Sequence, residues 1–209
     1  MRLYLLSQTL VENFSHIGFR KTAANHAYKF YIIGHHSNIS IINPTLTVFS
    51  LRKITLILLR LLSRRHKLCF ITHKLPPFLN GRELFPRHQY CLDYWVPGTF
   101  SNRRFSCLYG FSSSRTRLRR RVPSAVMLLG LSQRKSYDVY KETRRRRILC
   151  VSFLDTDCEP SIYSYFIPTN TKSAKTLYFY LDSFVHLLSY ANMLIKKRFI
   201  KYVFKKKKY

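Results

Sequence analysis

The sequence is poor in acidic residues: only 9 Asp and Glu accompany 37 Lys and Arg, which gives a formal net charge of +28 at pH 7. So large an excess cannot be neutralised within the chain and would repel itself in free solution, so we expect a polyanionic partner. Nucleic acid is the first candidate for this partner, and an anionic membrane surface is the second.

Long apolar runs are also missing. No stretch reaches the roughly 18 uninterrupted apolar residues of a membrane-spanning helix, and the nearest, ITLILLRLL at residues 54–62, is short and contains Arg60. The first residues, MRLYLLSQTLVENF, are too few and too weakly basic for a signal or transit peptide. We therefore expect a chain that is made where it works, or one with unconventional targeting information.

The cysteines show no pairing pattern. There are five, at positions 69, 91, 107, 150 and 158, and none forms a C-x-x-C pair. This spacing argues against a disulfide framework and a zinc ribbon, and predicts a reducing compartment in which cysteines act as small core residues. A metal site built from Cys150, Cys158 and a distant histidine is the alternative that the spacing leaves open.

Motifs for catalysis are absent as well. The sequence has no glycine-rich phosphate loop, no G-x-S-x-G and no H-E-x-x-H. Its one acidic cluster, LDTDCEP at residues 154–160, superficially resembles the D-x-D start of haloacid-dehalogenase-type phosphatases, with Asp155 as nucleophile and Asp157 as acid/base. That chemistry needs magnesium and a later acidic pair, and only Asp182 follows Glu159. We expect no enzymatic activity, cofactor or metal, and keep a phosphatase as an alternative.

What the sequence does have is a core: 46% of its residues are hydrophobic, which predicts one ordered domain. Strand and helix patterns alternate along it, as in a parallel sheet with helical crossovers. We expect strands at 39–42, 67–74, 89–92, 124–130 and 148–154, and helices at 47–66, 131–147 and from 170 onward.

Several local details can be predicted too. Thr45 or Thr47 is expected to cap the first helix, and Asn170 to cap the last. Val139, with Tyr137 and Tyr140, is expected to form the buried face of the middle helix. His35 and His36 are expected to lie in a turn.

Four segments in order resemble the ribosomal protein S2 family, the second protein of the small ribosomal subunit. They are HIGFRKTAANHAYKFYIIGHHSNISIINPTLTV (16–48), KLCFITHK (67–74), DYWVPGTFSN (93–102), and PSAVMLLG continuing through ILCVSFLDTDCEPSIYSYFIPTNTKSAKTL (123–177). The last is the most specific, because D-T-x-C-x-P, the Tyr before I-P and the following Asn all align without a gap. Together the segments span about 14–188.

The resemblance implies an α/β fold, a flavodoxin-like parallel sheet flanked by helices. It also implies an N-terminal extension at 1–15, an S2-like domain at 16–195 and a basic tail at 196–209. Residues 103–122 form a short basic loop, with no room for the long coiled-coil hairpin of bacterial members. Pro97, Asp157 and Glu159 depart from the family pattern. With these departures and its basic, tyrosine-rich composition, the sequence resembles mitochondrial members of the family more than plastid members.

The function that the resemblance implies is structural. We expect a constituent of the small ribosomal subunit in the mitochondrial matrix that supports translation, binds ribosomal RNA and neighbouring small-subunit proteins, and has no small-molecule substrate or membrane span. Arginine suits RNA because its planar fork can bind a phosphate with two hydrogen bonds. The expected RNA-binding residues are Arg20, Lys21, Arg103, Arg104, Arg115, Arg117, Arg119, Arg120, Arg121, Arg144, Arg145, Arg146, Arg147, Lys196, Lys197, Arg198, Lys205 and Lys206.

A second set of residues matches family motifs and is expected to be structural. Trp95 has two readings, an RNA contact or a core ring that seals a loop, and Asp155 is expected to accept backbone hydrogen bonds in a strand-end turn. The set comprises His16, Trp95, Asn102, Asp155, Pro160, Pro168 and Asn170.

Overall fold

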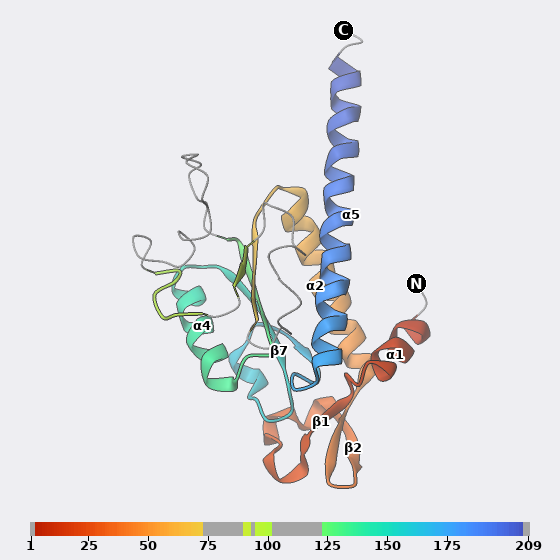
Figure 1. Cartoon of the computed structure of the whole chain (residues 1–209), viewed down its shortest axis with the longest axis vertical. Coiled ribbons are helices and arrows are strands. Elements are labelled where there is room, and N and C mark those ends of the chain that lie inside the picture. The colour runs from red at the N-terminus through yellow and green to blue at the C-terminus, as the bar shows by residue number, and fades with distance from the viewer. Residues whose placement is uncertain (1–2, 73–89, 93–94, 102–122, 207–209) are drawn as a thin grey trace.

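A five-stranded parallel sheet forms the centre of the protein (Figure 1). The computed structural model describes residues 3–72, 90–92, 95–101 and 123–206. The strands lie in the order β5-β4-β6-β7-β8, which is 2-1-3-4-5 along the chain and confirms the flavodoxin-like fold. Their bounds are β4 Leu68–Thr72, β5 Tyr90–Leu92, β6 Ala125–Leu129, β7 Leu149–Leu154 and β8 Tyr165–Pro168.

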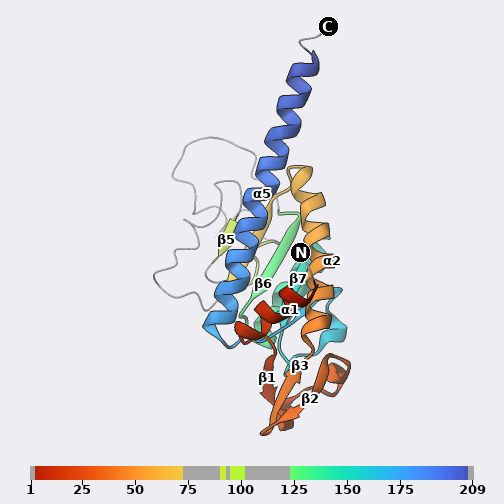
Figure 2. The same cartoon turned by 90° about the vertical axis from the view of Figure 1, so that its right-hand side faces the viewer.

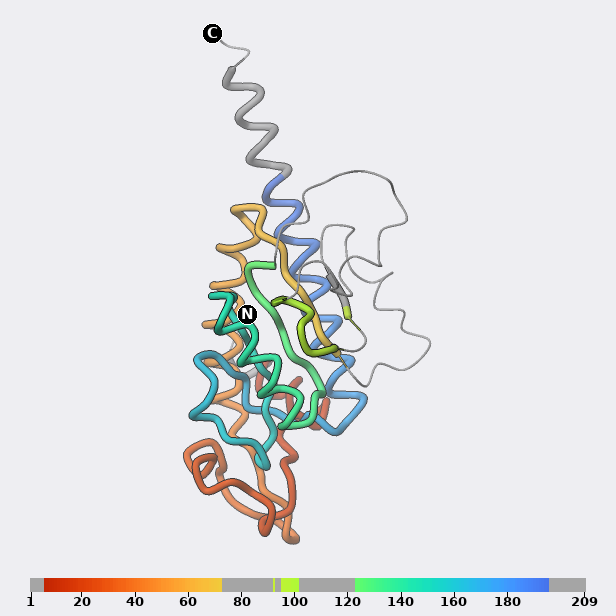
Figure 3. The backbone as a smooth tube through the Cα atoms, turned by 90° about the vertical axis from the view of Figure 1, so that its left-hand side faces the viewer, coloured from red at the N-terminus to blue at the C-terminus, as the bar shows by residue number. Residues whose placement is uncertain are grey.

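Helices cover both faces of this sheet. On one face lie α1 (Leu3–Glu12), α2 (Pro44–Ser63) and α5 (Ala174–Lys206), and on the other lies α4 (Gln133–Arg145) (Figures 1 and 3). Because both faces are covered, β4 and β6 are buried at every position, and this explains their unbroken apolar sequences. Each face has its own apolar cluster.

A second, smaller sheet was not predicted. Antiparallel strands β1 (Ile17–Arg20), β3 (Ile39–Ile42) and β2 (Ile32–His36) lie side by side, beyond one end of the main sheet (Figure 2). The strand predicted at 39–42 therefore exists but belongs to this sheet. We call residues 16–42 the N-terminal lobe.

The turn of this lobe differs from the prediction. Ser37 and Asn38 both have positive φ, 46° and 64°, as in the two-residue turns that join tightly twisted hairpins. His35 and His36, predicted in a turn, instead end β2. Histidine and glycine give β2 a weak strand signal, which explains the error.

The prediction of the first helix cap was wrong. Asn43, not Thr45 or Thr47, caps α2, because its side-chain oxygen accepts a hydrogen bond from the Thr45 amide at 3.0 Å. Thr47 lies inside the helix, and its hydroxyl donates to the Pro168 carbonyl at 2.8 Å. The Asn-Pro pair is itself a helix start, with proline in the first turn.

The last helix begins four residues later than expected. Asn170 accepts hydrogen bonds from the amides of Lys172 and Ser173, at 2.8 and 3.2 Å, so it forms a turn ahead of α5. The helix itself begins at Ala174, and the Ser173 hydroxyl accepts from the Thr176 amide. At 33 residues α5 is about 50 Å long, and it continues through most of the predicted tail.

Two further expectations concern buried residues. Val139 and Tyr140 line the inner face of α4 as predicted. The prediction for Tyr137 is wrong, since 38% of its surface is exposed. The N-terminal segment 1–15 contains α1, whose Leu10 is fully buried in the cluster shared with α2 and α5. Cys69, Cys150 and Cys158 form no disulfide and are buried, as expected of core residues.

Candidate nucleic-acid interface

Basic residues gather at one edge of the parallel sheet. The strands β4, β6, β7 and β8 begin at this edge, which we call the amino edge, and helices α2 and α4 both end there (Figure 1). The helix ends carry exposed cations from two segments distant in sequence. We define the amino-edge surface as Arg64, Arg65, Lys141, Arg144, Arg145, Arg146 and Arg147.

Helix α2 ends in a tight reversal. The His66 amide donates to the Leu61 carbonyl at 3.1 Å, and the Arg65 amide donates to the Leu62 carbonyl at 2.8 Å. These two bonds define a Schellman motif, in which the residue after the cap takes a left-handed conformation. Arg65 is that residue, with φ of 59°.

Helix α4 ends in the same way. The Ile148 amide donates to the Thr143 carbonyl at 3.0 Å, and the Arg147 amide donates to the Arg144 carbonyl at 3.1 Å. Arg147 has φ of 55°. Glycine is the usual residue at this position because a Cβ atom is strained there, so arginine carries a conformational cost at both helix ends.

Ser124 holds the two helix ends together. Its amide donates to the Lys67 carbonyl at 2.9 Å, and its own carbonyl accepts from the Leu149 amide at 3.1 Å. Its hydroxyl lies 2.9 Å from Nδ1 of His66. The turns after α2 and α4 therefore flank a single residue, and their arginines form one surface.

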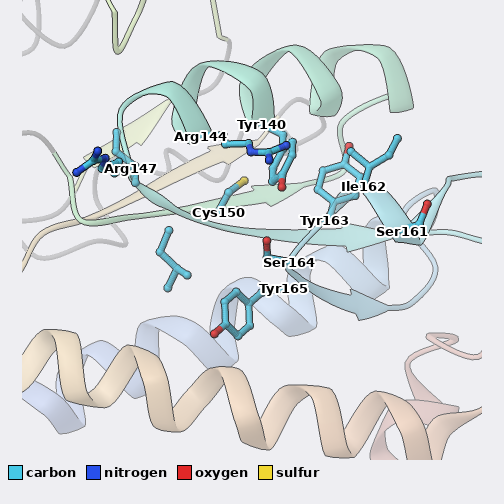
Figure 4. Close-up of a pocket in the computed structure, with 11 residues that line it drawn as sticks. Tyr140, Arg144, Arg147, Cys150, Ser161, Ile162, Tyr163, Ser164 and Tyr165 are labelled. Atoms are coloured by element: carbon cyan, nitrogen blue, oxygen red, sulfur yellow. The ribbon is translucent and has the colours of Figure 1, made fainter.

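A groove runs along α4 beside this surface. Its opposite wall is the 3₁₀ helix η4 (Pro160–Ile162) and the start of β8 (Figure 4). The groove consists of two adjoining pockets of about 450 and 540 Å³, and both are lined by Tyr140, Arg144, Ser161 and Ile162. None of the described residues that line either pocket is acidic.

A buried carboxylate fixes α4 to the loop that contains Trp95. Oε1 of Glu142 accepts hydrogen bonds from the amides of Phe100 and Ser101, at 2.7 and 2.5 Å. The Arg146 guanidinium donates to the Ser101 carbonyl. The Trp95 ring is partly buried and packs against the core cluster on the α4 face, which favours the core reading of this residue.

At the opposite, carboxyl edge of the sheet, Asp155 is structural. Only 1% of its surface is exposed, and its two oxygens accept from the amides of Thr156 at 2.7 Å and Thr171 at 3.3 Å. Burial raises the pKa of this carboxyl group to about 6, against the opposing effect of the two amides. The predicted backbone bonding is confirmed, and both oxygens of the suggested nucleophile are already engaged.

The N-terminal lobe covers the carboxyl edge beside Asp155. The Phe19 amide donates to the Thr156 hydroxyl at 2.7 Å, the Asn25 amide donates to the Thr156 carbonyl at 2.8 Å, and the Tyr28 hydroxyl donates to the Leu154 carbonyl at 2.8 Å. Flavodoxin-like folds bind ligands outside the carboxyl ends of their strands. Here that position holds the chain's own backbone, which argues against a small-molecule site.

The predicted RNA-binding residues are thus only partly brought together. Arg144 to Arg147 share the amino-edge surface, whereas exposed Arg20 and Lys21 lie in the lobe at the opposite end of the sheet. The predictions for Asn102, Arg103, Arg104, Arg115, Arg117, Arg119, Arg120 and Arg121 lie outside the described residues. For Lys196, Lys197, Arg198, Lys205 and Lys206 the structure describes only the helical backbone of α5.

The remaining motif residues have structural contacts. The His16 carbonyl accepts from the Ile42 amide at 2.8 Å, and burial lowers the pKa of the His16 ring. Pro160 opens η4, and Pro168 closes β8. Sequence reasoning missed Arg64 and Arg65 as site residues, although their place between a helical pattern and a buried strand marks them as a helix end.

Two searches of the described residues bear on the alternatives. No group of three or more His, Cys, Asp or Glu side chains in the described segments could hold a metal ion. Within the same segments, no helix combines the length and the apolar character that crossing a membrane requires.

Comparison with known proteins finds similarity to one family. A model of the family described as ribosomal protein S2 matches residues 111–189. Small ribosomal subunit protein uS2c of Euglena longa is 25% identical over 88% of this chain and 93% of its own length. Protein uS2m of Acanthamoeba castellanii is 22% identical over 95% of this chain and 62% of its own length, and uS2c of Oltmannsiellopsis viridis is 34% identical over 31% of this chain and 26% of its own length. With the 2-1-3-4-5 sheet, these matches show that the chain is similar to members of the ribosomal protein S2 family.

Proposed function

We propose that the chain is a structural constituent of the small subunit of the mitochondrial ribosome, where it binds ribosomal RNA and neighbouring ribosomal proteins. The family is not an enzyme class, and the covered carboxyl edge fits a role without catalysis. The main support for RNA binding is the amino-edge surface, where two helix ends present seven exposed cations.

The charges of this surface are available to an external anion. Among the described residues, Lys172 forms an ion pair with Asp157 and His186 forms one with Asp182, and neither pair includes a residue of the amino-edge surface. Arg146 does donate to a backbone carbonyl, which orients its guanidinium without neutralising it. Phosphate groups of RNA supply the missing negative charge, and such contacts hold a protein in register on its RNA.

The fold explains why these cations stay in position. Ser124 joins the two turns, and Glu142 anchors α4 to the loop at 95–101. The cations therefore lie on rigid helix ends rather than on a free loop. Preorganised arginines lose less conformational entropy on binding a phosphate than flexible ones do.

The organelle is proposed from the names of the relatives and from the composition of the chain. The suffixes m and c in the names of the relatives denote mitochondrial and chloroplast forms, so both organelles are represented. The basic, tyrosine-rich composition, with 15 tyrosines in 209 residues, and the short segment at 103–122 support the mitochondrial form. Detection of the chain in purified mitochondria, with purified plastids as the comparison, tests this choice.

Sedimentation tests the proposed function. A lysate of the organelle is separated on a density gradient at moderate and high salt, and the chain is detected across the fractions. The proposal expects it in the small-subunit peak at moderate salt. A chain that never travels with the small subunit overturns the proposal. Flotation with anionic vesicles would support the membrane-surface alternative, and magnesium-dependent phosphate release abolished by Asp155→Asn would support the phosphatase.

A further inference from the structure

The groove along α4 has a composition that the amino-edge surface as a whole does not explain. A flat basic surface suffices to hold a phosphate backbone, but this groove is concave and lined by aromatic rings as well as cations (Figure 4). The first pocket contains Tyr140 and Tyr163, with Tyr165 at its margin on the α2 side of the sheet, and the second contains Tyr137 and Tyr140. Rings in a basic groove are typical of sites for unpaired bases.

Arg144 lies where the two pockets meet, because it lines both of them. It is exposed, and its neighbours in the walls of the groove include Lys141 and Arg145 on one side and Arg147 on the other. A phosphate bound by Arg144 would therefore have one pocket on each side. This is the arrangement of a phosphate that links two nucleosides.

The size of the pockets favours single nucleotides over a duplex. Each has a volume of about 450 to 540 Å³, within the range of roughly 300–1,000 Å³ that is typical of small-molecule sites. A base in a duplex is stacked between its neighbours and cannot enter such a pocket, whereas an unpaired base can. The Ser164 hydroxyl on the η4 side can bond base edges or ribose 2′-hydroxyls, and the Ser161 hydroxyl, which donates to Glu159, can still accept a hydrogen bond.

The groove is not suited to catalysis. Its thiol, Cys150, is buried, and burial raises its pKa to about 12, so it stays protonated at neutral pH. The tilted Tyr140 and Tyr163 rings, with centroids 5.1 Å apart, join α4 to the segment after η4 and form a fixed floor. The pockets are therefore preformed binding sites.

We propose that this groove binds two consecutive unpaired nucleotides of an RNA strand, one in each pocket, with the linking phosphate on Arg144. The inference rests on the proposed function and adds the form of RNA that is bound.

The test uses the full chain and two RNA probes with equal numbers of phosphates: a single-stranded oligouridylate and a fully paired hairpin stem that is closed by a non-nucleotide linker. The proposal expects the single strand to bind about tenfold more tightly than the hairpin. It also expects Arg144→Gln to lower the single-strand affinity about tenfold, because a charged two-bond contact is lost. Arg134→Gln is the matched control: Arg134 is exposed on the same helix, lies outside both pockets, and should cost only about twofold.

A second variant and a crosslink test the aromatic contribution. Tyr137→Leu keeps a helix-forming residue on α4 but removes an exposed ring from the second pocket, so single-strand affinity should fall while hairpin affinity stays unchanged. Oligouridylate containing 4-thiouridine should crosslink to peptides that contain Tyr137, Tyr140 or Ile162.

Three results would overturn the inference: equal or tighter binding of the hairpin, equal losses for Arg144→Gln and Arg134→Gln, or crosslinks that map only outside the groove. Displacement of the oligonucleotide by uridine monophosphate at similar concentration would assign a free-nucleotide site and overturn it too. Sedimentation with the small subunit is measured separately. If the chain sediments there while the hairpin binds as well as the single strand, the groove is refuted and the proposed function stands.

Discussion

Arg65 and Arg147 take the same left-handed conformation, at φ of 59° and 55°, at the ends of two helices that lie on opposite faces of one sheet. Each follows a helix cap where glycine is the favoured residue. Complementing the negative ends of the two helix dipoles is one benefit of arginine there, but arginines inside the last turn already supply it. The proposed RNA contact would account for arginine at the strained position as well.

We predict that Arg65→Gly and Arg147→Gly each raise the free energy of unfolding by about 0.5–1 kcal/mol, because glycine removes the Cβ strain. The same variants should weaken RNA binding and lower the salt slope by about 1 each. Chemical denaturation and salt titrations measure the two effects. Arg145→Gly is the control, because Arg145 lies within α4 and its substitution should destabilise the helix by about 1 kcal/mol. Unchanged RNA binding in the first two variants would leave only the dipole explanation.

The Glu142 contacts predict a local loss of order. Glu142→Gln removes the negative charge that strengthens the hydrogen bonds from the amides of Phe100 and Ser101. We expect this substitution to lower the free energy of unfolding by about 1–2 kcal/mol. Hydrogen exchange at these two amides should quicken more than exchange in β6, which is remote from the substitution. Glu159→Gln serves as the control, since Glu159 is only partly buried and accepts from the Ser161 hydroxyl. Equal exchange in both variants would refute the anchoring role of Glu142.

Asp155 predicts a dependence of stability on pH. Its pKa is raised from 3.8 to about 6 in the folded protein, so between pH 4 and 6 the folded state binds a proton that the unfolded state has released. This contribution to stability is full below about pH 4 and is lost as the pH rises through 6, by about 3 kcal/mol in total. Asp155→Asn should remove this component, while Asp182→Asn on the exposed side of α5 should keep it. Identical pH profiles for wild type and Asp155→Asn would contradict the assignment.

The contact between the N-terminal lobe and the main sheet is close at Gly18. A Cβ atom there would lie 2.6 Å from Cγ2 of Thr156 and 3.0 Å from the Ser40 carbonyl oxygen. We expect Gly18→Ala to destabilise the fold by about 1–3 kcal/mol. Thr156→Ser removes the clashing methyl group and keeps the hydroxyl that binds the Phe19 amide, so the double variant should recover part of the loss.

Gly34→Ala is the matched control for that cycle, because no atom lies within 4 Å of a Cβ built at Gly34. Its effect on stability should stay within about 0.5 kcal/mol. Additive losses for Gly18→Ala and Thr156→Ser, measured by denaturation, would show that the two residues are not in contact.

The central sheet was largely predictable because its strands are buried on both faces. LCFIT at β4 and AVMLL at β6 are continuous apolar runs, a signal that needs no knowledge of the neighbours. The N-terminal lobe was not predictable, since β1 and β2 are short, half-exposed and interrupted by Gly18 and Gly34. The lobe that contains them is bonded to the main sheet through Thr156, some 130 residues away, and local propensity cannot show such contacts.

The candidate site was predictable in composition but not in arrangement. The run at 144–147 was recognisable as a cationic cluster, whereas its partner, Arg65, depends on where a helix ends to within one residue. The sequence could not predict the groove, because α4 and η4 are brought together only when the sheet has formed. Charge indicated the kind of partner, and the fold shows which charges share a surface.

Crosslinking within intact small subunits tests the central claim most directly. Small ribosomal subunits purified from the organelle are irradiated with ultraviolet light, digested, and analysed by mass spectrometry for nucleotides attached to peptides of this chain. We predict crosslinks on peptides that cover 64–67 and 140–150, at the amino-edge surface. Crosslinks confined to the outer faces of α2 and α5, or their absence from both predicted peptides, would contradict this account.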